Sequence, residues 1–249
     1  MSRYTATTRR VLVHTPPAGD TRAIAAPDLA ALVAPGHTAL LTVEVQQGVV
    51  GERSMLPSLA AAVAAGGVLE RIAGLCRGAR EVGVPVLHCT AESRPDGLGG
   101  NRNARLFALA RRAGPPPPAG SHEFDVHPAV GVEPADFVLP RLHGLSPLAR
   151  TSLDAILRNL GVTTIVATGV SVNVALLGLA FDAVNLGYQL VLARDATAGI
   201  GDDYVEAVYA NTLSLLATVT TTTAVFGAWA RRAQAERDAQ GPSGPAERG

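Results

Sequence analysis

The sequence predicts an α/β fold with a three-layer, doubly wound, mainly parallel sheet, a Rossmann-like arrangement. Three observations predict it. Short apolar runs alternate along the chain with stretches in which apolar residues recur at helical spacing. Several of these runs are apolar at nearly every position, which is typical of parallel strands covered on both faces. The 249 residues are 47% hydrophobic and 17% charged, which suits the core of one α/β domain.

The stretch from Thr163 to Ala183 shows the strand, turn and helix most clearly. An apolar run ends at Gly169, and the residues that follow at three- and four-residue steps are Leu176, Leu179, Ala180 and Ala183. In a parallel sheet this junction lies at the carboxyl ends of the strands, where ligands bind and where the helix directs its free N–H groups. The stretch therefore predicts a backbone pocket for a carbonyl or negatively charged oxygen. The side chains of the first turn are inert: Val172, Val174 and Ala175.

We expect a domain over residues 37–235, preceded by an N-terminal extension (1–36) and followed by a disordered polar tail (236–249). The extension is Pro-rich and weakly periodic, and we interpret it as a segment packed on the domain or on a partner subunit. The predicted strands are His37–Val45, Pro85–Thr90, Asp136–Leu139, Ile165–Ala167, Tyr188–Leu192 and, at one edge, Thr218–Thr222. The predicted helices are one long helix Ser58–Glu81, a short helix ending near Arg112, Ser152–Leu160, the helix after Gly169, Asp203–Leu216 and Ala224–Ala235.

Composition excludes several classes of protein. The net charge is zero, no basic run occurs and aromatic residues are 4%, so we expect no nucleic-acid partner. All 21 basic residues are arginine. The first ten residues contain no apolar signal region and no later run reaches membrane-spanning length, so we expect a soluble, cytoplasmic protein without a membrane partner. Two cysteines, Cys76 and Cys89, are too few for a disulfide framework or a cysteine zinc site.

Three segments carry a resemblance to a known family. They are ALLTVEVQQG, VLPRLHGLSPLARTSLDAILRNLGV and TGVSVNVALLGLAFDAVNLGYQLVLARDATAG. Together, in this order, they make the chain from His37 to Leu216 resemble the isochorismatase-like hydrolases, which include nicotinamidases, N-carbamoylsarcosine amidases and isochorismatases. The resemblance implies the α/β fold, a small-molecule substrate and a homodimer or higher homo-oligomer. The N-terminal extension and the helix after Asp203 offer surfaces for that association.

The chain departs from the family at the residues that carry its chemistry. By alignment, the family's aspartate falls on Glu44, its lysine on Arg141 and its nucleophilic cysteine on Ala175. Ala175 cannot form a covalent intermediate, so thiol-based amide hydrolysis at this position is excluded. Cys76 lies within the long predicted helix and is expected in the core. Cys89, at the end of a strand, is weighed as a displaced nucleophile, although a buried cysteine more commonly packs.

Isochorismatases proper, within the resembling family, work without the thiol, because the acidic residue protonates the carbon of an enol ether. Glu44 could act in this way if an apolar pocket raises its pKa. Alternatively, Glu44 and Arg141 form a structural ion pair, and a bidentate contact would lower that pKa. Arg141 stays charged, so it can bind a carboxylate or stabilise an oxyanion but cannot exchange a proton.

The resemblance also implies a non-proline cis peptide between Val170 and Ser171, and an oxyanion site made by the N–H groups of Ser171 and Ala175. Asn173 is expected either to reach the pocket or to cap the helix. Gln46 matches the family's glutamine after the acidic residue and is expected at the substrate. Because histidine is the residue type suited to acid–base chemistry near neutral pH, we weigh His143 as an acid–base group against a loop histidine that binds backbone.

No cofactor is expected. The loop after the second strand offers Asp96 but no histidine pair at metal-binding spacing, so we expect no metal. Two classes of function remain open from the sequence. The first is a Cys-independent hydrolase of a small polar metabolite that uses Glu44 and Arg141. The second is a catalytically silent relative that binds a small molecule or serves as a partner subunit.

Overall fold

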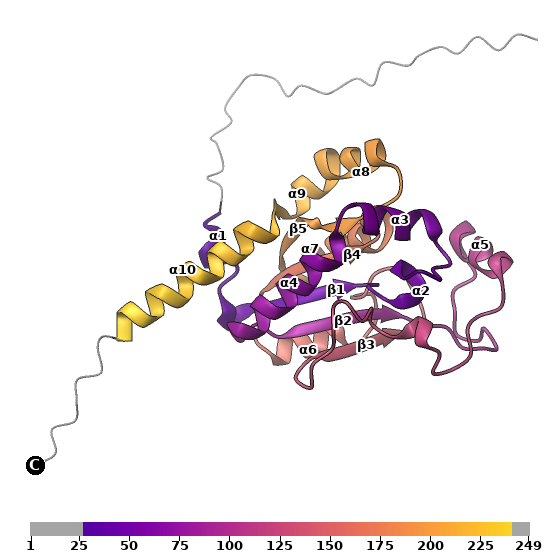
Figure 1. The fold of residues 1–249 in the computed structure, drawn as a ribbon, viewed down its shortest axis with the longest axis horizontal. Coiled ribbons are helices and arrows are strands. Elements are labelled where there is room, and N and C mark those ends of the chain that lie inside the picture. Colours follow the sequence, from indigo (N-terminus) through magenta and orange to yellow (C-terminus); the bar gives the residue numbers. More distant parts are fainter. Residues whose placement is uncertain (1–26, 241–249) are drawn as a thin grey trace, which may run out of the picture.

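The structure is a computed structural model that describes residues 27–240, with side chains up to 232. The described residues form a six-stranded sheet in the order β3-β2-β1-β4-β5-β6, and every neighbouring pair is parallel (Figure 1). The strands are β1 (Thr38–Val43), β2 (Val86–Ala91), β3 (Phe137–Arg141), β4 (Thr164–Val170), β5 (Gln189–Ala198) and β6 (Thr218–Thr220). The predicted parallel α/β sheet is therefore confirmed.

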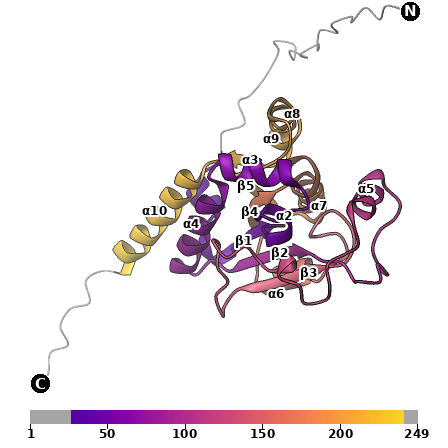
Figure 2. The ribbon, with the colours of Figure 1, turned by 45° about the vertical axis from the view of Figure 1, so that its right-hand side comes forward.

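Two hydrophobic cores lie on the two faces of the sheet. In β1, Leu40 packs into one core while Leu41 and Val43 pack into the other, because successive strand residues point to opposite faces. The first core is covered by α3, α4 and α10, and α4 and α10 lie side by side (Figures 1 and 2). The second is covered by α6, α7 and the helical segment after β5. This doubly covered sheet explains why its strands are almost continuously apolar.

The helices are, in chain order, α1 (Leu29–Leu32), α2 (Gln47–Val50), α3 (Pro57–Ala65), α4 (Val68–Glu81), α5 (Arg105–Ala113), α6 (Leu153–Asn159), α7 (Leu177–Leu186), α8 (Asp202–Val208), α9 (Ser214–Leu216) and α10 (Thr222–Gln240). Short 3-10 turns are η1 (Pro35–His37) and η2 (His122–Phe124), and π-helical turns are η3 (Val172–Leu176) and η4 (Tyr209–Leu213).

The prediction of one long helix over Ser58–Glu81 is wrong. The chain forms α3 and α4, bent by 67° at Gly66–Gly67. Gly67 has a φ of 57°, a left-handed conformation that glycine adopts at little cost and that ends a helix. No single helix within the described residues is long and apolar enough to span a membrane, although α3 and α4 pass by length and composition when taken together.

Other boundaries differ from the sequence prediction. β3 continues through Pro140 to Arg141, which an edge strand allows because a proline there need not donate to a neighbour. β5 runs six residues past Leu192, and the predicted helix from Asp203 is interrupted by η4. The last helix runs to Gln240, so residues 236–240 of the predicted tail are helical.

Part of the predicted extension, residues 27–36, packs on the domain. Val33 is fully buried, and its carbonyl oxygen accepts a hydrogen bond of 3.0 Å from Nε1 of Trp229 in α10. This contact joins the N-terminal segment to the C-terminal helix. Residues 1–26 of the extension and 241–249 of the tail lie outside the described residues.

Candidate active site

Strand β1 delivers Glu44 to the carboxyl edge of the sheet. The strand ends at Val43, and Glu44 then takes a left-handed conformation with a φ of 53°. Non-glycine residues adopt this conformation rarely, and such residues cluster at functional sites. The Glu44 N–H still donates to the carbonyl of Cys89 in β2 at 2.9 Å. Glu44 is therefore held on the sheet at the point where the chain turns away from it.

Strand β3 delivers Arg141 to the same edge. Arg141 is the last residue of β3 and is aligned with Ala91 of β2. Its Nη2 donates to Oε1 of Glu44 and to the carbonyl of Leu145, the latter at 3.1 Å. The Glu44 side chain is 19% exposed and that of Arg141 is 5% exposed. Because β2 lies between β1 and β3, this ion pair spans the end of β2.

The pKa of Glu44 lies above that of an ordinary glutamate. Burial raises it, and the positive charge and hydrogen bond of Arg141 lower it by less. The contact uses only one guanidinium nitrogen, Nη2, so it lacks the bidentate geometry that would hold the carboxylate charged most strongly. Glu44 is therefore protonated more readily than an ordinary glutamate, while its contact with Arg141 still favours the charged form.

Two other nitrogen donors of Arg141 are available to a bound molecule. Its Nε and Nη1 are buried and have no hydrogen-bond partner among the described residues. A buried donor without a partner costs about 1–3 kcal/mol. These N–H groups are therefore the donors of the site best suited to the oxygen of a bound molecule.

The turn after β4 lies beside the backbone of Glu44. In the pairing of β1 with β4, Gly169 is aligned with Val43. A Cβ atom on Gly169 would lie 2.2 Å from the Val43 carbonyl oxygen, so only glycine permits this close approach. The Val170–Ser171 peptide bond is cis, the isomer that the resemblance implies. The π-helical turn η3 follows directly.

Ala175 lies in this turn and is 1% exposed. The N–H groups of Val174 and Leu176 both donate to the carbonyl of Ser171, at 3.2 and 3.1 Å. The side chain of Asn173 does not cap the helix, because Ser171 is the N-cap residue and no side-chain cap bond is formed. Asn173 Oδ1 is buried and has no hydrogen-bond partner in the described part of the chain. The amide is thus an unused acceptor next to the turn.

Gln46 and His143 differ in how their side chains are engaged by the rest of the protein. The Gln46 side chain is buried, its Nε2 donates to the carbonyl of Ala91 at 2.9 Å, and its Oε1 accepts the Ala91 N–H at 2.6 Å. Its amide is therefore engaged by main chain and positions the strand ends. His143 is exposed and has no hydrogen bond or ion pair with another described residue, so the backbone-binding alternative weighed for it is not observed.

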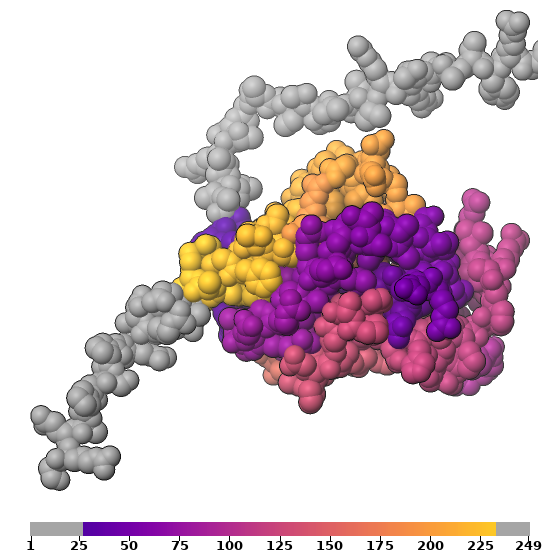
Figure 3. All heavy atoms as spheres, in the orientation of Figure 1, coloured from indigo at the N-terminus to yellow at the C-terminus, as the bar shows by residue number. Residues whose placement is uncertain are grey.

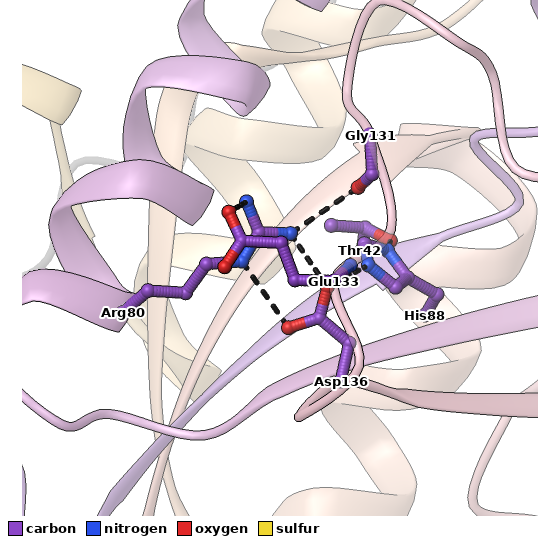
Figure 4. A network of polar contacts seen from close by, with 6 residues as sticks. All are labelled: Thr42, Arg80, His88, Gly131, Glu133 and Asp136. Carbon is purple, nitrogen blue, oxygen red and sulfur yellow. Dashed lines mark hydrogen bonds and ion pairs between the residues drawn. The ribbon is translucent and has the colours of Figure 1, made fainter.

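A buried polar network joins β1, β2, α4 and Asp136, the residue just before β3 (Figure 4). His88 Nδ1 lies 2.8 Å from Oγ1 of Thr42, and His88 Nε2 lies 3.3 Å from Oδ2 of Asp136. The Nε and Nη2 atoms of Arg80 in turn donate to the two oxygens of Asp136, at 3.2 and 2.6 Å. Because the Asp136 carboxylate only accepts, His88 carries its proton on Nε2, and the Thr42 hydroxyl donates to Nδ1.

Sequence reasoning missed this network. His88 is fully buried in a strand, and burial lowers its pKa by more than the Asp136 contacts raise it. The pKa of Asp136 is lowered on balance, although burial opposes its bonds to Arg80, to the Glu133 N–H and to His88. The available signal was a histidine inside an apolar strand, because a polar group at such a position requires a partner.

Neither cysteine can supply the missing thiolate. Cys76 and Cys89 are both free and buried. Burial raises the pKa of each thiol to about 12. The thiolate is the reactive form, so a displaced cysteine nucleophile is not supported.

Two hollows open near the carboxyl edge. They have volumes of about 310 and 240 Å³, and neither is lined by Glu44, Arg141 or Ala175. The larger is lined by Glu92, Gly120, Ser121, Phe124, Asp125, Val126, Val132 and Val138. The smaller is lined by Gln47, Gly51, Glu52, Arg53, His122, Glu123, His127 and Pro128. Among residues 27–240, no three His, Cys, Asp or Glu side chains form a group that could hold a metal ion.

Comparison with known proteins agrees with this architecture. The ureidoacrylate amidohydrolase RutB of Pseudomonas savastanoi pv. phaseolicola is 26% identical over 184 residues, which cover 69% of this chain and 75% of that protein. A cysteine hydrolase from Pseudomonas syringae pv. phaseolicola superposes with a TM-score of 0.70 at 22% identity, over 81% of this chain and 96% of that one. An N-carbamoylsarcosine amidase from Thermoplasma acidophilum superposes with a TM-score of 0.59 at 23% identity, over 75% and 96%.

The family model of the isochorismatase domain matches residues 38–224. This match begins at the first residue of β1 and extends into α10, so it contains the whole sheet, Glu44, Arg141 and the turn at Ala175. The chain is therefore a member of the isochorismatase family of hydrolases.

Proposed function

We propose that this chain is a hydrolase of a small polar metabolite that works without a thiol. Glu44 serves as acid and base, and Arg141 stabilises charge. The observation that carries the proposal is the buried Glu44–Arg141 pair at the carboxyl edge, in which Glu44 has a raised pKa. By the resemblance, Ala175 takes the position of the family's cysteine, in the turn that follows the pairing of β4 with the end of β1. A carboxyl group with a raised pKa is a more effective proton donor near neutrality.

The chemistry requires one water molecule. Protonated Glu44 donates its proton to the substrate, on the leaving group or on the carbon of an enol ether. Water attacks the electrophilic carbon, and the bond to the protonated leaving group breaks. In an enol ether, where the proton has gone to carbon, the hydroxyl proton of the resulting hemiketal passes to the departing oxygen as that bond breaks. The proton released by the attacking water returns to the Glu44 carboxylate, which restores the acid. Arg141 cannot exchange a proton, but its permanent charge stabilises that carboxylate while the proton is away.

The substrate oxygen would be held by backbone and by Arg141. The N–H groups of Ser171 and Ala175, around the cis bond after Val170, are the proposed oxyanion donors. The unpartnered Nε and Nη1 of Arg141 support the same role. Asn173 Oδ1, also unpartnered, would accept from an N–H or O–H group of the substrate. Gln46 holds the strand ends in place and does not itself contact the substrate.

The relatives indicate which substrates to test first. One is named a ureidoacrylate amidohydrolase and a structural neighbour is named an N-carbamoylsarcosine amidase. We therefore propose ureido and carbamoyl acids, simple amides and enol ethers as the panel. A small polar metabolite also suits a site whose available groups are one carboxyl, one guanidinium and backbone N–H groups.

Two observations favour a second candidate, a silent relative that binds a metabolite or a partner subunit. Ala175 offers no nucleophile, and neither hollow includes the ion pair. On this alternative, Glu44 and Arg141 bind a ligand without turning it over. Binding alone would raise the melting temperature in the presence of that ligand.

Product formation measured by mass spectrometry across the panel separates the two candidates. Glu44→Gln keeps the shape of the side chain but cannot exchange a proton, so turnover of an active compound should fall about a hundredfold or more. The matched control is Glu81→Gln, which removes an exposed carboxylate at the end of α4 and should leave turnover unchanged. Ala175→Cys alone should not create amidase activity, because Glu44 and Arg141 replace the shorter aspartate and the lysine.

If Glu44→Gln retains full turnover, the proposed acid–base role is wrong. If no compound is turned over but one raises the melting temperature, and Arg141→Met abolishes that rise, the binding alternative is correct.

A further inference from the structure

The segment between β2 and β3 is tied to the loop after β3 through Asn101. Residues 99–114, which include α5, project from the body of the protein at the carboxyl edge (Figures 1 and 3). Oδ1 of Asn101 accepts the N–H of Gly144 at 2.8 Å, across 43 residues of sequence. Within the described part of the chain, this is the hydrogen bond that joins residues 99–114 to the rest of the protein.

The side chain of Asn101 is held with its oxygen toward Gly144. Its Nδ2 donates to Oδ1 of Asn103 at 3.1 Å. The opposite orientation of the amide would bring two donors together, the NH2 group of Asn101 and the N–H of Gly144. The Asn101 carbonyl also accepts from Nη1 of Arg111 at 3.3 Å, which fastens the residue to α5. Asn101 therefore presents one fixed acceptor to the loop after β3.

The loop after β3, residues 142–145, has few other contacts to fix its shape. Gly144 has a φ of 77°, a left-handed conformation in which the chain turns sharply. The other three residues of the loop are exposed. Among the described residues, its main chain makes two hydrogen bonds: the Gly144 N–H donates to Asn101, and the Leu145 carbonyl accepts from Arg141. The bond to Asn101 is thus the contact from outside that fixes the turn.

The Leu145 carbonyl in turn directs the guanidinium group of Arg141. Nη2 of Arg141 donates to this carbonyl at 3.1 Å and also to Oε1 of Glu44. The other two guanidinium nitrogens, Nε and Nη1, have no partner in the described part of the chain and so do not orient the group. The direction of the guanidinium therefore depends on the two contacts of Nη2. A displaced carbonyl would move the same nitrogen that holds Glu44.

We propose that Asn101 is a positioning residue for Arg141. Asn101 fixes the turn at Gly144, the turn places the Leu145 carbonyl, and that carbonyl aligns the guanidinium with Glu44. Asn101 itself forms no hydrogen bond with either member of the ion pair in the described structure. The value of this alignment for catalysis rests on the proposed function, whereas the alignment itself is a property of the folded chain and can be measured without a substrate.

The ionisation of Glu44 reports on this alignment. Burial raises the pKa of Glu44, and Arg141 is the charged group that lowers it, through its charge and its hydrogen bond. Both effects of Arg141 weaken when the guanidinium is less well aligned, so loss of the Asn101 acceptor should raise the pKa of Glu44 further. Asn101 carries no charge, so it has no charge of its own with which to shift that pKa directly.

NMR titration of the full chain, with glutamate carboxyl groups labelled with carbon-13, tests the proposal. Glu44→Gln assigns the Glu44 signal, and Asn101→Ala should raise the pKa read from that signal. The matched control is Asn211→Ala, which removes an exposed amide that bonds the Ala207 carbonyl at 2.8 Å, and it should leave the pKa of Glu44 unchanged. Circular dichroism with a thermal melt checks that each variant is folded.

A second pair of variants tests the turn itself. Gly144 has a positive φ, and a Cβ atom there would meet no other atom within 4 Å, so Gly144→Ala strains the turn without a clash. Gly83, with a φ of 75°, is equally open and lies in a different turn. Gly144→Ala should raise the pKa of Glu44, as Asn101→Ala does, and Gly83→Ala should not.

The decisive measurement repeats Asn101→Ala in a chain that carries Arg141→Met. If Asn101 acts through Arg141, the substitution should no longer change the pKa of Glu44, whereas a general loosening of the fold would change it in both backgrounds. An unchanged Glu44 pKa in Asn101→Ala or in Gly144→Ala, or an equal rise with and without Arg141, would overturn the proposal. None of these readings requires turnover, so a chain without activity would contradict the proposed function alone.

Discussion

Glu44 and Arg141 are 97 residues apart in the chain and meet across the end of β2. Each is tied separately to that strand: the Glu44 N–H donates to the Cys89 carbonyl and the Glu92 N–H donates to the Arg141 carbonyl, both at 2.9 Å. The spacing of the two charged side chains is thus set by hydrogen bonds of the sheet. Substitutions in β2 should disturb the pair even where they touch neither member.

Removing one member of this buried pair should cost more than removing both. Arg141→Met leaves Glu44 without its counter-charge and should lower the free energy of unfolding by about 3 kcal/mol. Adding Glu44→Gln to that variant should recover part of the loss. Urea unfolding of the two single variants and the double variant measures the coupling. Arg94→Met, which breaks an exposed pair with Asp96, should lower the free energy of unfolding far less than Arg141→Met does. An equal loss at both positions would contradict the burial argument.

The two thiols should be unreactive in the folded protein. Cys76 and Cys89 are buried and each has a pKa raised to about 12, so almost no thiolate is present near neutrality. Iodoacetamide at pH 8 should label neither residue in buffer and both in denaturant, as read by intact-mass spectrometry. Any turnover found for the native protein should survive the same treatment. Rapid labelling of Cys89 in buffer would revive the displaced nucleophile.

Stability should fall on mild acidification because of His88. Its pKa is lowered from 6.5 in the folded state, so the unfolded chain binds the proton more readily, and stability is lost as pH falls through about 6.5. His88→Gln should lower stability by about 1–3 kcal/mol at pH 7.5, since Thr42 and Asp136 lose a partner. The same substitution should also reduce the change in the free energy of unfolding between pH 7.5 and 5.5. Some slope should remain, because burial lowers the pKa of His127 as well.

The matched control for His88 is His143→Gln, which alters an exposed ring with no interaction among the described residues. It should change neither the stability nor its pH dependence. Equal slopes in the wild type and in His88→Gln would show that the buried ring does not set the acid sensitivity.

Gly169 should tolerate no side chain. Its φ is 102°, and a Cβ atom would meet the backbone oxygen of Val43 at 2.2 Å. Gly169→Ala should therefore cost at least about 3 kcal/mol, from overpacking added to an unfavourable backbone conformation. Gly83 also has a positive φ, of 75°, but open space around it, and Gly83→Ala should cost about 1 kcal/mol. Thermal melts of the two variants test whether the close approach of Gly169 to Val43 costs more stability than the positive φ alone.

The sheet could be predicted from sequence because its signal is local. Each strand is an apolar run bounded by polar or turn residues, and the alternation with helices predicts parallel pairing. The break at Gly66–Gly67 was missed because apolar spacing continues through it, and only the left-handed φ of Gly67 shows the bend. The extension of β5 beyond Leu192 depends on pairing of Thr197 and Ala198 with β4, which no local pattern reveals.

The candidate site could also be predicted only in part. Glu44, Arg141 and Ala175 were located because aligned segments carry them, and the contact of the first two followed from the resemblance. The Thr42–His88–Asp136 contacts were missed because they join β1, β2 and the residue before β3, which become neighbours only once the strand order is known.

The side chain of Gln46 has a consequence for the left-handed turn at Glu44. Its amide oxygen accepts the N–H of Ala91, and its amide nitrogen donates to the carbonyl of the same residue. These are the two hydrogen bonds that a main-chain neighbour in a paired strand would make. The Gln46 amide thus continues the pairing of β1 with β2 by one step beyond the end of β1. Both polar groups of Ala91 thus stay paired on the side of β1, although β1 has already ended. The backbone that follows Val43 therefore need not pair with Ala91. β1 can end next to the charged residue Glu44 without loss of these hydrogen bonds.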